Sequence, residues 1–238
     1  ALVAIPLVAR ILFPRSVAIL LRAFGHLGTP PRTDLRLKRE EETPTDAPTA
    51  IGYTLGEMAS IVGNALRSMG LTPEHGFSSV IVICGHGSAS LNNPQEAAHD
   101  CGACGGGRGG PNARAFAQMA NDPNVRRILA ADGLIIPDGV SFVAAYHNTC
   151  DDSVTWYDLD HLRRENRSVF EHARGIVDVA RRKNAHERCR RFESAPLSLD
   201  DAGALRHVEG RAEDLSQTRP EYGHATNALA LVGRREWS

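Results

Sequence analysis

Apolar and polar positions in the middle of the chain fall into blocks that predict a helix and then a strand. From Thr54 to Gly70 the apolar positions recur at helical spacing, with Thr54 and Glu57 forming a capping box and Gly70 placed to end the helix. Residues 79–84 are almost continuously apolar. Such a run is typical of a strand that is buried on both faces of a parallel sheet.

Further helices and strands are predicted downstream of residue 84. Pro111 opens a predicted helix, and Asp122 caps a shorter helix that Gly133 closes. The chain from His161 to about residue 193 has helical spacing. The predicted strands cover residues 134–136, 140–147, 155–159 and 228–232. Strands that alternate with helices predict an α/β fold with an open, mostly parallel sheet flanked by helices.

The first fifty residues have a different character. Residues 2–24 carry apolar positions at helical spacing, and residues 28–50 are rich in proline around a run of three glutamates. We therefore predict a helical segment with a Pro/Glu-rich linker over 1–50 and an α/β domain over 51–238. No apolar run is long enough to cross a bilayer.

Composition adds limits on function. The formal net charge of −1 gives no general attraction to nucleic acid or to an anionic membrane. The five cysteines are too few and too unevenly placed for a disulfide framework. The chain starts with Ala1, inside an apolar segment, so we expect a fragment of a larger protein or a processed chain.

The candidate chemistry lies in the loop after the first predicted strand. His86 comes two residues after that strand, where open α/β sheets place their ligands. Cys101 lies within loop reach of His86, and imidazole and thiolate are good zinc ligands. Two ligands do not complete a catalytic zinc site, so these residues indicate an incomplete His/Cys metal site.

Other interpretations of this loop remain open. His86 fits a structural, hydrogen-bonded histidine, and Cys101-x-x-Cys104 fits a structural zinc knuckle that lacks its second pair. Glycines 105–110 before a helix fit an anion site for phosphate, although they match no nucleotide-binding fingerprint. Ser88 fits a nucleophile only weakly, because its neighbours do not form the Gly-x-Ser-x-Gly elbow.

Several short motifs in combination identify a family. Between about Gly52 and Arg235 the chain resembles the DabA subunits of Dab-type inorganic carbon transporters. The motifs that carry this resemblance are Gly85-His-Gly-Ser, Asn92-Asn-Pro, Asp100-Cys-Gly-Ala-Cys-Gly-Gly, Gly110-Pro-Asn-Ala-Arg-Ala, Tyr146-His-Asn-Thr and Asn184-Ala-His-Glu-Arg.

The resemblance implies a β-carbonic-anhydrase-like fold and zinc site in the C-terminal portion of a longer protein. In the family a Cys-x-Asp pair, a His and a Cys hold the zinc, and the last two match His86 and Cys101, with Cys104 as the second choice. The family's Cys-x-Asp-x-Arg element lies upstream and has no match there in this chain. Cys150-Asp-Asp152 has the Cys-x-Asp spacing but lies after the loop. We therefore expect this chain to carry half of a zinc site.

The resemblance also implies a function. It predicts a subunit of an energy-coupled CO2/bicarbonate transporter that performs zinc-dependent, vectorial CO2 hydration with the membrane subunit DabB, which is similar to the proton-pumping subunits of respiratory complex I. The implied location is the cytoplasmic face of the bacterial inner membrane, as a peripheral protein. No nucleic-acid partner is expected, and this chain alone is expected to be inactive.

No catalytic residue beyond the metal ligands is identified by the sequence. Four polar residues could support the metal ligands or only stabilise the fold: His99, Asp100, His147 and His224. Two other functions stay open, a non-enzymatic scaffold subunit with a structural zinc and a phosphate-binding α/β enzyme.

Overall fold

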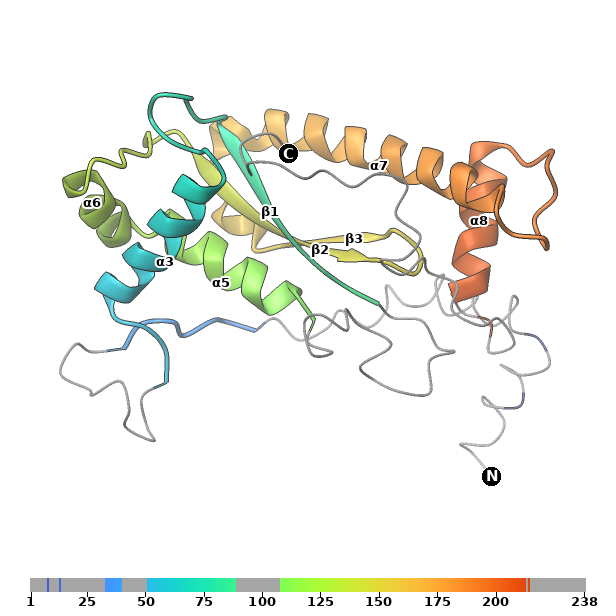
Figure 1. Ribbon diagram of the computed structural model, residues 1–238, viewed down its shortest axis with the longest axis horizontal. Coiled ribbons are helices and arrows are strands. Elements are labelled where there is room, and N and C mark those ends of the chain that lie inside the picture. The colour runs from blue at the N-terminus through green and yellow to red at the C-terminus, as the bar shows by residue number, and fades with distance from the viewer. Residues whose placement is uncertain are drawn as a thin grey trace.

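A small sheet with helices on both faces forms the body of the protein (Figure 1). The computed structural model describes residues 33–39, 51–88 and 108–212, together with Val8, Phe13 and Asp214. In chain order the elements are α3 (Leu55–Ser68), β1 (Val80–Gly87), α5 (Gly110–Asn121), α6 (Pro123–Ala131), β2 (Ser141–Asn148), β3 (Val154–Tyr157), the short 3-10 helices η2 (Leu159–His161) and η3 (Arg164–Asn166), α7 (Arg167–Cys189) and α8 (Asp201–Ala212).

The three strands lie in the order β1-β2-β3. Strands β1 and β2 are parallel and in register from Val80 opposite Ser141 to Gly87 opposite Asn148. Strand β3 returns antiparallel to β2. The predicted α/β class with an open sheet is therefore confirmed, and the described sheet combines one parallel with one antiparallel pair.

The two faces of the sheet pack against different helices. On one face Phe142 and Ala144 of β2 join the main hydrophobic core with α3, α5 and α6. On the other face Val143 packs with Leu162 and Phe170 beneath α7. Beyond the sheet the C-terminal part of α7 forms a third apolar cluster with α8, so α8 contacts the body of the protein chiefly through α7 (Figure 1).

The predicted helix ends are confirmed where local hydrogen bonds define them. Thr54 accepts a hydrogen bond from the backbone of Glu57, whose side chain accepts one from the backbone of Thr54, as a capping box requires. The carboxylate of Asp122 accepts hydrogen bonds from the first turn of α6. Gly70 and Gly133 follow helix ends with positive φ angles of 71° and 80°, which glycine adopts without strain.

Two strand predictions need correction. Residues 134–136 form no strand: Leu134 and Ile136 are buried in the main core, but no described strand pairs with them, so their apolar character reflects core packing alone. Strand β1 is not buried on both faces, because Val82 is 37% exposed and Cys84 is also exposed. It also extends to Gly87, which places His86 inside the strand instead of beyond it.

One described helix was not predicted, and some predicted elements lie outside the described residues. Helix α8 was not predicted, although Asp200 accepts a hydrogen bond from the backbone of Gly203 at its start. Residues 33–39 pack on the α/β body, where Lys38 forms an ion pair with Asp122. The predicted N-terminal helices, apart from Val8 and Phe13, and the predicted strand at 228–232 lie outside the described residues.

We predict that Phe170→Ala lowers the free energy of unfolding by about 3 to 5 kcal/mol, because it leaves a cavity under α7. Phe170 is 1% exposed and meets Trp156 edge to face with ring centroids 5.1 Å apart. Denaturant unfolding measures the change. Val169→Ala, on the exposed side of the same turn, is the matched control, and an equal loss in both variants would contradict the packing argument.

Candidate functional site

The candidate site lies at the carboxyl ends of β1 and β2, where parallel strands of open α/β sheets present ligands. His86 is the penultimate residue of β1 and is exposed. In the parallel register it lies opposite His147 of β2. Residues paired in this way point to the same face of a sheet, so both imidazoles belong to the face on which α7 packs.

Two glycines allow the start of α5 to approach the strand end closely. The backbone N–H of Gly109 donates a hydrogen bond of 2.8 Å to the carbonyl of His86. A Cβ added to Gly85 would overlap the carbonyl group of Gly109, and a Cβ on Gly109 would lie 2.6 Å from the backbone nitrogen of His86. The backbone around His86 is thus fixed by a contact that only glycine permits.

The carbonyl of the next residue, Gly87, is held by Thr149, the first residue after β2. Gly87 accepts hydrogen bonds from the backbone N–H of Thr149 at 2.8 Å and from its hydroxyl at 3.2 Å. The motifs Gly85-His-Gly-Ser and Tyr146-His-Asn-Thr are therefore joined directly at the strand ends.

A buried polar network lies behind His147. Its Nε2 is 2.9 Å from Oδ1 of Asp152, and Oδ2 of Asp152 accepts hydrogen bonds from Arg188 at 2.7 Å and from Asn184 at 2.8 Å. Arg188 also donates to the carbonyl of Cys150 at 3.1 Å. The carboxylate of Asp152 therefore joins the histidine of one motif to the asparagine and arginine of Asn184-Ala-His-Glu-Arg.

Opposing effects set the charge of Asp152. Burial by itself raises its pKa, but the hydrogen bond with His147, the positive charge of Arg188 and the hydrogen bonds from Arg188 and Asn184 together outweigh burial and leave the pKa below its usual value. Asp152 is therefore an anion at neutral pH. Since its two oxygens contact three side chains, it orients His147 and neutralises Arg188, whose side chain is 4% exposed.

Cys150-Asp-Asp152, which has the spacing of the family's Cys-x-Asp pair, belongs to the same network. The thiol of Cys150 is buried and donates to the side-chain oxygen of Asn148 at 3.1 Å. Asp152 adopts a positive φ of 57°, which places its carboxylate in the network described above. Both residues thus have contacts that account for them within the fold.

Cys84 is a further thiol near His86 that the sequence reading did not use. It lies two residues before His86, so both side chains belong to the same face of the sheet. Partial burial raises the pKa of the Cys84 thiol, while a hydrogen bond from the backbone of His147 acts in the opposite direction. Burial has the larger effect, so this cysteine is a neutral thiol at physiological pH.

The described residues do not contain a complete metal site. No group of three or more His, Cys, Asp or Glu side chains in this part of the chain could hold a metal ion. Of the two predicted ligands only His86 is described, and Cys101 lies outside the described residues, as do Cys104, His99, Asp100 and His224. The assignment of His86 and Cys101 to zinc remains a prediction.

Asp152, Asn184 and Arg188 are the site residues that sequence reasoning missed as a group. A signal was present, because Asn184 and Arg188 are four residues apart and so share one face of α7. Their common partner, however, lies more than thirty residues upstream, at a turn that no local pattern connects to α7.

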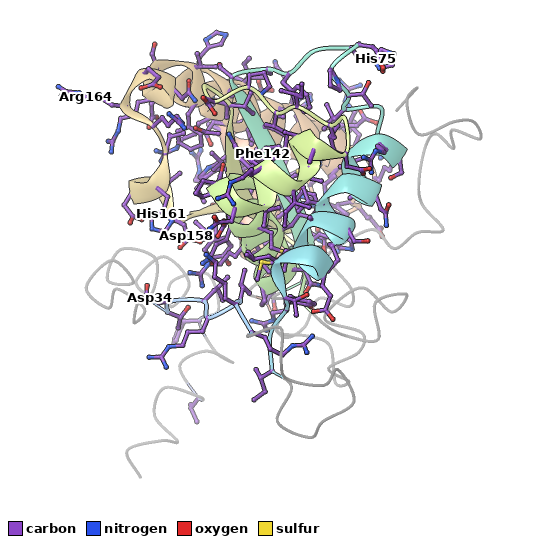
Figure 2. The ribbon with its side chains drawn as sticks, turned by 90° about the vertical axis from the view of Figure 1, so that its left-hand side faces the viewer. Asp34, His75, Phe142, Asp158, His161 and Arg164 are labelled. Atoms are coloured by element: carbon purple, nitrogen blue, oxygen red, sulfur yellow. The ribbon has the colours of Figure 1, made fainter. Side chains whose placement is uncertain are left out.

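A separate cavity of about 310 Å³ lies beside α5 and is lined by residues that include Arg114, Phe142, Asp158 and His161. Figure 2 shows Asp158 and His161 on the side of the molecule on which Asp34 lies. Arg114 forms a two-pronged pair with Asp158 at 2.8 Å and also donates to Thr33. Because these charges pair with each other, the cavity is less suited to a charged ligand than the end of β1.

Comparison with known proteins agrees with these motifs. The family described as "Probable inorganic carbon transporter subunit DabA" matches residues 1–238. A subunit of that description from Rhodopirellula baltica is 56% identical over 238 residues, one from Sorangium cellulosum 48% over 236, and one from Methylococcus capsulatus 47% over 239.

These alignments cover 97 to 100% of this chain but 22% of each relative, so the chain spans about a fifth of their length. No solved structure matches the chain. None of the described helices is both long and apolar enough to cross a membrane.

We predict that Asp152→Ala lowers the free energy of unfolding by about 3 to 5 kcal/mol near neutral pH, because it leaves the buried charge of Arg188 without its partner. The folded-state pKa of Asp152 is depressed, so its contribution is present above the unfolded-state pKa of about 3.9 and is lost as the pH falls through the lower folded-state value. Denaturant unfolding of both proteins at a series of pH values should show the difference shrinking toward low pH.

Asp132→Ala is the matched control for Asp152→Ala. Asp132 also pairs with an arginine, Arg67, but the two side chains are 70% and 41% exposed. The expected loss is therefore at most about 1 kcal/mol. Equal losses in the two variants would contradict the role assigned to burial.

We also predict that Gly85→Ala lowers the free energy of unfolding by about 1 to 3 kcal/mol, because its methyl group would force the start of α5 away from β1. Gly175→Ala is the control, since the added Cβ meets nothing within 4 Å on α7 and should raise stability by about 0.5 to 1 kcal/mol. Thermal or denaturant unfolding measures both. A neutral Gly85→Ala would show that the close approach is not required.

Proposed function

Because the chain belongs to the DabA family, we propose that it forms part of an inorganic carbon transporter subunit and supplies two zinc ligands, His86 and Cys101. The observation that carries the proposal is the position of His86: an exposed imidazole at the carboxyl end of a parallel strand, inside the family's Gly-His-Gly-Ser motif. The remaining ligands would come from a Cys-x-Asp pair in the part of the family polypeptide that this chain does not span.

The donor set fits zinc. A neutral imidazole and a thiolate are ligands that zinc prefers. When bound, zinc would supply hydration chemistry by lowering the pKa of water so that hydroxide can attack CO2.

The chain's own residues would position and support that site. Hydrogen bonds to the carbonyls of His86 and Gly87 hold the strand end, so the His86 imidazole projects from a fixed backbone. Asp152 holds the neighbouring His147 in one orientation through Nε2. Such supporting contacts around a ligand are what keeps a metal site rigid.

At the level of the whole transporter, we infer a peripheral subunit at the cytoplasmic face of the bacterial inner membrane that works with the membrane subunit DabB. Coupling CO2 hydration to cation flow through that partner would make hydration one-way and accumulate bicarbonate. The names of the relatives support the transport of inorganic carbon by a subunit, and the coupling mechanism is part of the proposal.

We predict that His86→Ala and Cys101→Ala each abolish stoichiometric zinc binding in a family-length subunit that contains this chain. Elemental analysis of the purified subunit measures zinc per polypeptide. His75→Ala is a matched control on an exposed loop, and Cys104→Ala tests the competing cysteine; both should retain zinc. Unchanged zinc content in both His86→Ala and Cys101→Ala would refute the assignment.

Bicarbonate uptake by cells that express both subunits separates the alternatives. Loss of zinc together with loss of uptake supports zinc-dependent hydration. Loss of zinc with uptake retained would support the scaffold subunit with a structural zinc. Binding of inorganic phosphate by a subunit without zinc would support the phosphate-binding alternative.

A further inference from the structure

One ring nitrogen of His147 takes part in none of the contacts described above. Nε2 lies 2.9 Å from Oδ1 of Asp152. Within the described part of the chain Nδ1 has no hydrogen-bond partner, and the side chain is 36% exposed. The imidazole therefore presents one accessible nitrogen at the carboxyl ends of the strands, where open α/β sheets bind their ligands.

The partner of Nε2 decides which nitrogen of the neutral ring carries the proton. Burial raises the pKa of Asp152, but its hydrogen bonds with His147, Arg188 and Asn184 and the charge of Arg188 keep that pKa below its usual value, so the carboxylate is an anion. An ionised carboxylate only accepts hydrogen bonds, so the proton between the two groups belongs to Nε2. The neutral imidazole then has a lone pair at Nδ1, which is a hydrogen-bond acceptor.

The remaining contacts of Asp152 keep the imidazole in this state. Its Oδ2 accepts hydrogen bonds from Arg188 at 2.7 Å and from Asn184 at 2.8 Å, and its side chain is 10% exposed. A ring bonded to a carboxylate that is fixed in this way keeps one orientation and one tautomer. The motif Asn184-Ala-His-Glu-Arg, to which the proposed zinc site assigns no ligand, thus acts through Asp152 on the acceptor at Nδ1.

The position of His147 in the sheet places this acceptor beside the proposed metal ligand. Strand β2 lies between β1 and β3, and its His147 is paired with His86 of β1 on the same face (Figure 1). Neighbouring strands are about 4.8 Å apart. Asp152 belongs to the turn between β2 and β3, on the other side of β2 from His86. A small molecule bound at His86 therefore has His147 as its neighbour on the β2 side.

The chemistry of CO2 hydration indicates what such an acceptor binds. The reaction joins CO2, which has no hydrogen to donate, with a water molecule, which donates through its O–H groups. We propose that Nδ1 of His147 accepts a hydrogen bond from the water that adds to CO2, and that Asp152 positions His147 for this contact. The hydrogen bond orients the water before it reacts and involves no covalent step at His147. This inference rests on the proposed function, because it needs the metal site at His86.

Two amide substitutions separate the two ring nitrogens, in a family-length subunit expressed with its membrane partner. The side-chain amide of glutamine reaches the place of Nε2, so His147→Gln should keep the contact with Asp152, the zinc content and the denaturant midpoint. It lacks an acceptor at the place of Nδ1. The maximal rate of bicarbonate uptake should fall about tenfold, the rate equivalent of one hydrogen bond, while the half-saturating concentration of inorganic carbon changes less than about twofold.

His147→Asn should give the opposite order. Its shorter amide does not reach Asp152, so the subunit should unfold at a lower denaturant concentration than His147→Gln. Its carbonyl oxygen lies near the place of Nδ1 and can accept the hydrogen bond, so uptake should fall less than in His147→Gln. A histidine with a purely structural role would lose stability and uptake in the same order. His172→Gln, on the exposed side of α7, is the matched control and should retain zinc, stability and uptake.

Asp152→Asn tests the assigned tautomer. The carbonyl oxygen of the new amide can accept the hydrogen bonds from Arg188 and Asn184, and its N–H group then donates to Nε2 of His147. The ring proton moves to Nδ1, which changes from an acceptor to a donor, as in serine proteases with the same substitution. Zinc content should stay unchanged, while the maximal rate of uptake should fall at least as far as in His147→Gln.

Three results would overturn this inference and leave the proposed function intact. One is wild-type uptake by His147→Gln with zinc retained. Another is a raised half-saturating concentration with an unchanged maximal rate, which would assign the contact to inorganic carbon instead of water. The third is loss of zinc from His147→Gln, which would make His147 a metal ligand. Absence of zinc from the unsubstituted subunit would overturn the proposed function, and this inference with it.

Discussion

The ion pair between Asp152 and Arg188 is the contact on which the arrangement of the C-terminal half depends. Helix α7 has no fully buried residue between Phe170 and Ala185, so it is held at two separate points. At its start Phe170 packs on the sheet, and near its end Asp152 binds Arg188 and Asn184. Because α8 packs mainly on α7, the position of α8 also follows from this buried pair.

The same carboxylate connects stability with the candidate site. A buried charge pair is costly to assemble, and it is tolerated where further hydrogen bonds satisfy the remaining donors and acceptors. Here the second oxygen of Asp152 contacts His147, which lies opposite His86 in the sheet. The residue that anchors α7 therefore also fixes the orientation of the side chain beside the proposed zinc ligand, so a change at Asp152 acts on both.

The sequence predicted features that depend on residues close together in the chain and missed those that depend on distant residues. The capping box at Thr54, the cap at Asp122 and the turn at Gly133 are set by residues within four positions, and all three were predicted. Residues 134–136 were wrongly assigned to a strand because apolar character reports burial, whereas a strand also needs a partner. At the site, His86 was identified from its position after a strand, but the Asp152 network joins segments that no local pattern relates.

At strand β1 the burial predicted from the sequence differs from the burial in the structure. Its continuous apolar run predicts burial on both faces, as in strands inside parallel sheets. Within the described residues, however, no strand pairs with its outer edge, and Val82 is 37% exposed. An open apolar edge is an aggregation hazard, and proteins avoid it at little cost by placing a charge or a proline there. A sequence with Val-Ile-Val-Ile at this position has the composition of an interior strand, whereas within the described residues β1 lies at the edge of a sheet of three strands.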